Sequence, residues 1–451
     1  MSNDVKLQRA ALMRNPNFRW LLGGGVISML GDQMTMIALP WLVLTLTHDA
    51  LALGLTIAVM SIPRAVFILI GGALVDRYSP KRVLMLTKFA NAVLLAMLTA
   101  LTLNTHPTLT MTLAMTPHVT LTILYALALG LGLAQAFGIP SGTSIMPQAI
   151  APEHLQGANG MLMGLRQLSL LAGPLLTAGL IALAGDGGNG TVANARGLAL
   201  AFAFDCFSFL LSAWTLSHVT GLRTPPRADD QGVLRSIGSG LKMVWDDHAL
   251  RTCFIYWGVV ALFIGGAMQV ALPVLASERL HGATSLGLLM AANGCGTLIG
   301  MAAAAMGGAR LRLASFGATI LLIDGLAGLL LMPFGAITAA WQGCLLLLTV
   351  GVLSGFMQIA VFTWIQRRVP PQMMGRAMSL FMFIFMGLAP LSAAAAGWLL
   401  TRLTLTQMFA CGGGLLVLFA VGAALFSPMR RIAYASAPAA PTAKPSNRES
   451  T

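Results

Sequence analysis

The chain has 451 residues, of which 57% are hydrophobic and only 9% are charged. Soluble domains carry charges on about a quarter of their residues, so this composition excludes an ordinary water-exposed surface and indicates one that faces lipid. The net charge of +13 would suggest nucleic-acid binding in a soluble chain, and the placement of the charges decides that question.

Apolar stretches recur along nearly the whole sequence. Each is long enough for a helical crossing of a bilayer, which takes roughly 20 residues. The sequence therefore predicts an all-α polytopic membrane protein with 12 transmembrane helices. Their predicted ranges are 19–46, 50–74, 83–104, 119–147, 157–184, 197–219, 251–276, 284–306, 315–334, 337–364, 376–400 and 406–427.

The 27 Lys and Arg lie mostly on one side of these spans. With the N-terminus in the cytoplasm, 22 of these 27, Lys88 included, fall on or beside cytoplasmic segments. This asymmetry follows the positive-inside rule and predicts two cytoplasmic termini, with lipid and not nucleic acid as the surroundings. The exceptions are Arg196, Arg279 and Arg402 outside, and Arg64 and Arg166 within spans.

Polar segments divide the chain. We expect an N-terminal six-helix half at 1–219, a cytoplasmic linker at 220–250, a C-terminal six-helix half at 251–430 and a disordered cytoplasmic tail at 431–451. The linker is predicted to carry a short amphipathic helix at the membrane surface, through Leu234, Ile237, Leu241 and Val244.

The two halves carry a weak repeat. Arg19 matches Arg251 at an offset of 232 residues, whereas 38–40 (Ala-Leu-Pro), 53–55 (Leu-Gly-Leu) and Arg77 match their counterparts at 233. Gln148, Pro152 and Gly157 match at 218, because an external loop near 105–118 has no counterpart in the second half. A constant register of this kind indicates duplicated halves around a central pathway.

Charges inside the hydrocarbon are costly and need partners or water. Asp32, in the middle of the first span, either binds a proton or cation, or forms a permanent salt bridge with Arg64 or Arg166. Either arginine could instead attract an anionic group of a cargo. Asp205 and Asp324 are expected at the periphery of the halves, in packing or capping roles.

The loop after the second span begins with Gly72 and contains Asp76 and Arg77, followed by Lys81 and Arg82. This order between the second and third of twelve spans resembles the signature loop of the major facilitator superfamily. The chain also resembles the branch of that superfamily that contains the enterobactin exporter and macrolide efflux proteins. The resemblance lies in short segments such as 17–19, 30–32, 62–64 and 147–159. The resemblance implies a conformational-switch role for the loop, and for Arg376 in the second half.

The fifth span contains Gly164, Gly173 and Pro174, which resemble part of the antiporter signature of drug exporters. In the fold that the resemblance implies, the first, fourth, seventh and tenth helices line the pathway. Its candidate residues, with Asp32, Arg64 and Arg166, are Met36, Gln135, Gln269 and Gln358. Met378, Met382, Phe385 and Met386 either extend this lining or serve packing.

The predicted function is secondary transport, with proton-coupled efflux of an amphipathic drug or siderophore-like molecule by a monomer in the bacterial inner membrane. Proton-coupled uptake and a non-transporting receptor are the alternatives. No catalytic or metal-ligand motif is found, and the five cysteines stand singly, so we expect no enzyme activity, cofactor or metal.

Overall fold

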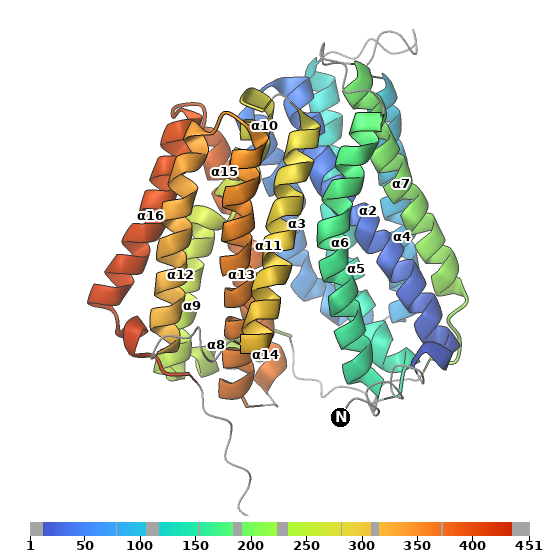
Figure 1. The fold of residues 1–451 in the computed structure, drawn as a ribbon. Helices are drawn as coiled ribbons and strands as arrows, with labels where there is room; N and C mark the ends of the chain where they lie inside the picture. The colour runs from blue at the N-terminus through green and yellow to red at the C-terminus, as the bar shows by residue number, and fades with distance from the viewer. Residues whose placement is uncertain are drawn as a thin grey trace, which may run out of the picture.

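A computed structural model describes residues 12–77, 79–104, 117–151, 154–183, 192–222, 233–280, 282–307, 315–370 and 373–434. Within these ranges the chain is helical and contains no strand, which confirms the predicted all-α class (Figure 1). The predicted tail beyond residue 434 and most of the loop at 105–118 lie outside the described residues.

The N-half comprises six helices: α2 (Pro16–Thr47), α3 (Ala50–Arg77), α4 (Pro80–Asn104), α5 (Pro117–Ala149), α6 (Leu155–Leu183) and α7 (Val192–Ser217). Within the described ranges of the whole chain, 11 helices are long and apolar enough to cross a membrane. The described apolar part of α3 is shorter, Ala50–Arg64, but the helix itself has 28 residues. Together these helices account for the twelve predicted crossings.

The C-half repeats this arrangement with interruptions. Its first crossing combines α9 (His248–Val260), a π-helical turn η2 (Ala261–Gly265) and α10 (Ala267–Glu278). Its fifth crossing likewise combines α14 (Met374–Phe383), a π-helical turn η5 (Ile384–Leu388) and α15 (Ala389–Leu399). The other four are α11 (Ala283–Gly307), α12 (Phe316–Leu331) with η3 (Met332–Ala336), α13 (Ala340–Arg368) and α16 (Leu405–Phe426) with η6 (Pro428–Arg431).

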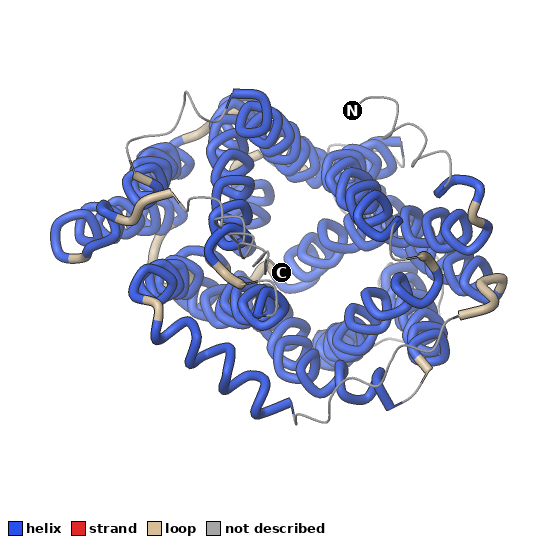
Figure 2. Tube along the Cα trace, turned by 90° about the horizontal axis from the view of Figure 1, so that it is seen from below, coloured by secondary structure: helices blue, strands red, loops and turns tan. Residues whose placement is uncertain are grey.

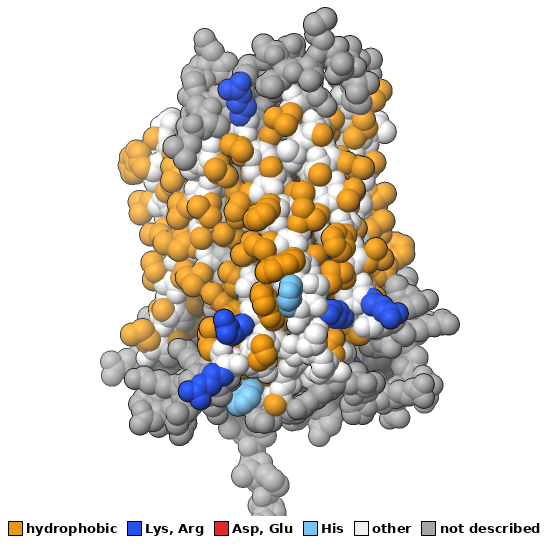
Figure 3. All heavy atoms as spheres, turned by 90° about the vertical axis from the view of Figure 1, so that its right-hand side faces the viewer, with side chains coloured by type: hydrophobic (Ala, Val, Ile, Leu, Met, Phe, Trp, Pro, Cys, Tyr) orange, Lys and Arg blue, Asp and Glu red, His pale blue; other side chains and the backbone are white. Residues whose placement is uncertain are grey.

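The helices of the two halves stand side by side and roughly parallel to one axis (Figures 1 and 2). On the face shown in Figure 3, apolar side chains cover the middle, and Lys and Arg gather mainly toward the end where the N-terminus lies. We name this end the lower end. An apolar band bounded by charge is what a bilayer-spanning surface requires.

The halves meet at backbone distance near the upper end. A Cβ added to Gly54 of α3 would lie 2.7 Å from the Ala393 carbonyl oxygen of α15, and one added to Gly287 of α11 would lie 2.9 Å from that of Pro174 in α6. Gly54 and Gly287 are equivalent in the repeat. Small residues allow such close crossings, which replace the hydrophobic driving force that lipid cannot supply.

The buried apolar side chains show the same distribution. One core cluster joins both halves, with Leu53 and Ile57 from the N-half and Leu275, Leu286 and Ala393 from the C-half. Toward the lower end the clusters are separate: Phe18 and Ile145 belong to one, whereas the cluster around Trp257 and Trp364 belongs to the other half. The described contacts therefore join the halves above and leave them apart below.

The predicted linker helix is present as α8 (Val233–Asp246). Val244 is buried against the C-half, whereas Leu241 and Trp245 are more than half exposed. Gly240 packs against the Cβ of Arg376 in α14. The helix thus lies on the lower end of the C-half.

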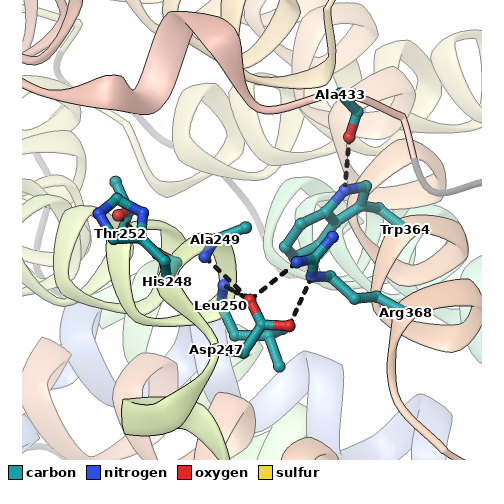
Figure 4. A network of polar contacts seen from close by, with 8 residues as sticks. All are labelled: Asp247, His248, Ala249, Leu250, Thr252, Trp364, Arg368 and Ala433. Atoms are coloured by element: carbon teal, nitrogen blue, oxygen red, sulfur yellow. Dashed lines mark hydrogen bonds and ion pairs between the residues drawn. The ribbon is translucent and has the colours of Figure 1, made fainter.

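Asp247 fixes the junction between α8 and α9 (Figure 4). Its Oδ1 accepts hydrogen bonds from the backbone N–H groups of Ala249 and Leu250, and both carboxylate oxygens accept from Arg368 at 2.8 and 2.9 Å. Burial raises the pKa of this carboxyl, but the hydrogen bonds from Arg368, Leu250 and Ala249 and the Arg368 charge outweigh burial and lower the pKa overall. In the repeat, Asn15 caps α2 at the equivalent position, accepting from the Phe18 N–H.

Gly54→Ala should lower the stability of this conformation by about 1–3 kcal/mol, because the new methyl group would collide with the backbone of α15. Thermal unfolding of the purified protein in detergent measures the effect. Gly179→Ala in α6 is the control, since a Cβ there meets nothing within 4 Å. Equal stability of the Gly54 variant and the control would contradict a backbone-distance contact.

Asp247→Asn should cost about 0.5–1 kcal/mol at neutral pH, because asparagine keeps the helix cap but loses the exposed ion pair. Asp247→Ala should cost about 1 kcal/mol more, since it also removes the cap. The carboxylate's contribution is present above its ordinary pKa and is lost as the pH falls through its lowered pKa. The difference in unfolding free energy between wild type and the Asn variant should therefore begin to shrink near the ordinary pKa of about 4 and vanish below the lowered pKa; a constant difference would exclude the ion pair as its source.

Candidate functional site

Asp32 lies in the middle of α2, between two helix contacts. On one side, a Cβ at Gly31 would collide with the Asp205 carboxylate of α7; on the other, Gln33 packs against Gly173 of α6. The Asp32 side chain lies between these directions and is half-buried. Met36, one turn later on the same face, is 55% exposed. Asp32 and Met36 therefore share the face of α2 that neither α6 nor α7 covers.

Two cations act electrostatically on Asp32: Lys88 of α4 and Arg64 of α3. Within the described residues the direct ion pair is that of Asp247 with Arg368. Asp32 thus forms a direct salt bridge with neither Arg64 nor Arg166 in this conformation. A permanent pair, one of the two alternatives for Asp32, is not formed here.

Lys88 lies inside the N-half, and its prediction as a cytoplasmic charge is wrong. It belongs to the apolar span 80–103, where its Nζ donates to Ser28 Oγ at 3.3 Å and lies 5.2 Å from the centre of the Phe209 ring. Its charge acts on both Asp32 and Asp205. A lysine eight residues into a span, between Thr87 and Phe89, was the signal available in the sequence.

Asp205 also lies inside the N-half, which corrects its expected peripheral position. It is 1% exposed, and its two oxygens accept hydrogen bonds from Thr35 at 2.5 Å and from Ser208 at 3.0 Å. A larger residue than Gly31 would displace it from α2. We name Asp32, Lys88 and Asp205, with the hydroxyl groups of Ser28, Thr35 and Ser208, the inner polar cluster.

Arg64 and Gln135, both predicted to lie along the pathway, are in direct contact. Arg64 Nη1 donates to Gln135 Oε1 at 2.7 Å, and Nη2 donates to Ser61 Oγ at 3.4 Å. Arg64 Nε is buried without a hydrogen-bond partner within the described part of the chain. The guanidinium therefore joins α3 to α5 while its buried Nε–H stays unpaired among the described residues.

The structure places Arg166 and Gln358 in opposite halves at the same region. Gln167 donates to the Gln358 side chain at 3.5 Å and to the Met301 sulfur at 2.7 Å. Arg166 and Gln358 are both exposed. Gln269, in α10, is exposed too.

Of the three antiporter-like residues, Gly173 and Pro174 lie at close helix contacts and Gly164 does not. Gly173 allows α6 to approach α2, and Pro174 offers its carbonyl oxygen to the close contact with Gly287. A Cβ at Gly164 would meet nothing within 4 Å, so packing does not require glycine there.

The switch loop is described in part. The side chains of residues 72–77, including Gly72, Asp76 and Arg77, lie outside the described residues. Lys81 donates to the carbonyl oxygens of Ser217 and Val219 at 3.0 and 2.7 Å, so it caps α7 within its own half. Arg82 is exposed, and Arg376 contacts the Met373 sulfur at 3.3 Å.

Asp324 has a local partner. Tyr256 of α9 donates to its Oδ2 at 2.7 Å, so this acid joins two helices of the C-half. That contact agrees with the packing role expected for it. The described residues contain no group of three or more His, Cys, Asp and Glu that could hold a metal.

The family model described as Major Facilitator Superfamily matches residues 21–394. Curated relatives include the enterobactin exporter EntS of Shigella boydii serotype 18 and of Escherichia coli O81. Each is 24% identical to the chain over 414 residues, which cover 91% of this chain and 92% of the relative.

Solved structures share the fold. A bacterial homologue of the iron transporter ferroportin in an inward-facing state has a TM-score of 0.67 at 17% identity, over 90% of this chain and 98% of its own. The nucleoside transporter NupG has a TM-score of 0.67 at 12% identity, with the same coverage. The xylose transporter XylE from E. coli has a TM-score of 0.60 at 16% identity, over 91% and 99%.

Lys88→Met should lower the free energy of unfolding by up to about 3–5 kcal/mol, because it leaves buried carboxylates without their cation. The double variant with Asp205→Asn should recover part of that loss. Thermal unfolding, followed with a dye that reacts with newly exposed cysteine thiols, measures both; Lys242→Met, at an exposed position, is the control. If the second substitution restores nothing, the two charges are not coupled.

Proposed function

Because the chain belongs to the major facilitator superfamily, we propose that this transporter exports an amphipathic small molecule in exchange for protons, by alternating access. Membership establishes a multi-pass membrane protein that moves small molecules. Direction, coupling ion and cargo belong to the proposal. We further propose that it works as a monomer in the bacterial inner membrane with both termini in the cytoplasm, as the distribution of Lys and Arg supports.

Export rests on the relatives. The EntS proteins are named as exporters and align over nine-tenths of this chain. The similar structures include a D-xylose–proton symporter, but an identity of 15% carries the fold and not the direction. Of the residues that the sequence relates to antiporters, Pro174 lies at a contact between the halves, whereas Gly173 packs against Gln33 within the N-half. Uptake remains the alternative outcome of the test below.

Alternating access is supported by where the halves touch. Their close contacts and their shared core lie toward the upper end, while the lower clusters are separate. This distribution fits a state that opens toward the lower, cytoplasmic end. Rocking the halves would break the contacts at Gly54 and Gly287 and bring the lower ends together.

Proton coupling is assigned to Asp32. It is a half-buried carboxylate that forms no direct ion pair with any described residue, and Lys88 and Arg64 act on it from two other helices. A proton on Asp32 would remove its attraction for both cations and leave Lys88 to Asp205. Because these residues lie on α2, α4 and α7, a change in their attraction bears on how three helices of the N-half pack.

The amphipathic character of the cargo is inferred from what is exposed. Met36 and Met163 of the N-half are 55% and 60% exposed, and Phe385 and Met386 of η5 are 41% and 38% exposed. Thioether and aromatic groups adapt to varied apolar shapes. Exposed Gln358 supplies polar groups without charge. Such a mixture suits a molecule with apolar and polar parts.

Asp32→Asn should abolish transport that depends on a proton gradient, because asparagine cannot exchange a proton at this position. The measurement is accumulation in inverted vesicles of lipophilic cations, macrolides and catecholate siderophores, with and without the gradient. Asp324→Asn is the matched control, since that acid is bonded to Tyr256 in the other half. Gradient-driven export that survives in the Asp32 variant would move coupling elsewhere, and accumulation only in right-side-out vesicles would indicate uptake.

A further inference from the structure

The direction of Arg166 follows from its helix. Gly173, seven residues later and therefore on almost the same face of α6, packs against Gln33 of α2. Gln167, the next residue, contacts α11 and α13 of the opposite half. Arg166 therefore points between α2 and the C-half, toward the centre of the molecule.

The lipid-facing side of α6 is a different one. Gly164, Leu168 and Leu175 are exposed and lie on the opposite side of the helix from Gly173. The exposed side chain of Arg166 therefore faces the space between the halves and not the lipid. Met163, 60% exposed and within one turn of Arg166, lies on the same central face.

The charge balance of this central region is positive. Asp32 is acted on by Lys88 and Arg64, and Asp205 by Lys88 and two hydroxyl groups. Asp324 is bonded to Tyr256. Arg166 therefore stands in the described central region without an acid assigned to it. A cationic cargo would meet this charge unfavourably, whereas an anionic one would neutralise it.

The opposite half offers hydrogen-bonding groups without a charge. Gln358 lies 3.5 Å from Gln167, the immediate neighbour of Arg166, and it is exposed. A guanidinium and a carboxamide, one from each half, can hold two oxygens of an acidic group. Because they belong to different halves, a ligand held by both bridges the parts that move.

We propose that Arg166 and Gln358 form a subsite for the acidic group of the cargo, so that the transported class is amphipathic anions, either carboxylates or ionised catechols, and not lipophilic cations. The apolar body of such a molecule lies against Met36 and Met163. This inference rests on the proposed transport function and names its substrate class.

The test is direct binding to the purified full-length protein, which needs no gradient. Three fluorescent probes share a dansyl body: dansylglycine is anionic, dansylamide neutral and dansylcadaverine cationic. Wild type should bind dansylglycine at least about 10-fold more tightly than dansylcadaverine, as expected for charge-assisted hydrogen bonds. Tighter binding of the cationic probe would overturn the proposal without any variant.

Variants then locate the subsite. Arg166→Gln should weaken dansylglycine binding about 10- to 100-fold and leave dansylamide unchanged, Arg166→Lys should lose less, and Gln358→Leu about 3- to 10-fold. Arg402→Gln, at an exposed position near the upper end, is the control. Thermal unfolding confirms that each variant is folded. Dansylglycine binding that is unchanged in both Arg166→Gln and Gln358→Leu would refute the subsite.

Two further readouts separate the remaining questions. Displacement of dansylglycine by 4-butylbenzoate tests carboxylates, and displacement by 4-butylcatechol, at a pH high enough to ionise one of its hydroxyl groups, tests ionised catechols. Displacement by either supports the subsite. Displacement by neither refutes it. Wild-type protein that binds the anion at Arg166 but shows no gradient-driven flux would sink the export proposal and leave the subsite standing. Gradient-driven flux of cations alone would support export and refute the anion subsite.

Discussion

A charge held inside the hydrocarbon layer must find partners or water, and the N-half is organised around that constraint. Lys88 can lie inside the span only because Ser28, Asp32 and Asp205 surround it from neighbouring helices. Asp205 in turn needs the hydroxyl groups of Thr35 and Ser208. Gly31 is small because a carboxylate occupies the space beside it.

The two halves do not share this chemistry equally. At the offset of 233 residues, Arg64 corresponds to Thr297 and Lys88 to Leu321, and Asp32 corresponds to the end of the η2 turn at Gly265. The C-half uses aromatic packing instead: Trp364 stacks on Phe316 with ring centres 4.6 Å apart, and Trp257 meets Phe381 edge-on. The helices of the two halves correspond, whereas Asp32, Arg64 and Lys88 have no ionisable counterpart in the C-half.

Much of the fold could be predicted from the sequence because its signals are local. Runs of apolar residues gave all twelve crossings, with ends generally within a few residues of the helices observed, and the loop at 72–82 indicated the family that the comparisons confirm. Sites depend on contacts between helices, which no local pattern records. Arg64 and Gln135 were both candidates, but their hydrogen bond joins residues 71 apart. Lys88 was counted among the cations on or beside cytoplasmic segments, and only the packing of α4 against Ser28 and Phe209 shows that it turns inward.

The residue offset between the two halves changes by one at each of the two π-helical turns. Before η2 the halves are offset by 232 residues, as at Asn15 and Asp247, and after it by 233, as at Gly54 and Gly287. Before η5 the offset is 218, at Gly157 and Gly375. After it the offset is 219, because Pro174 and Ala178, which contact Gly287, correspond to Ala393 and Gly397, which contact the equivalent Gly54. A π-helical turn holds one residue more than the α-helical turn it replaces. Each change in offset therefore falls on a π-helical turn of the C-half, which has one residue more than the continuous helix α2 or α6. The extra residue is accommodated in that turn, and the contacts on either side keep their positions.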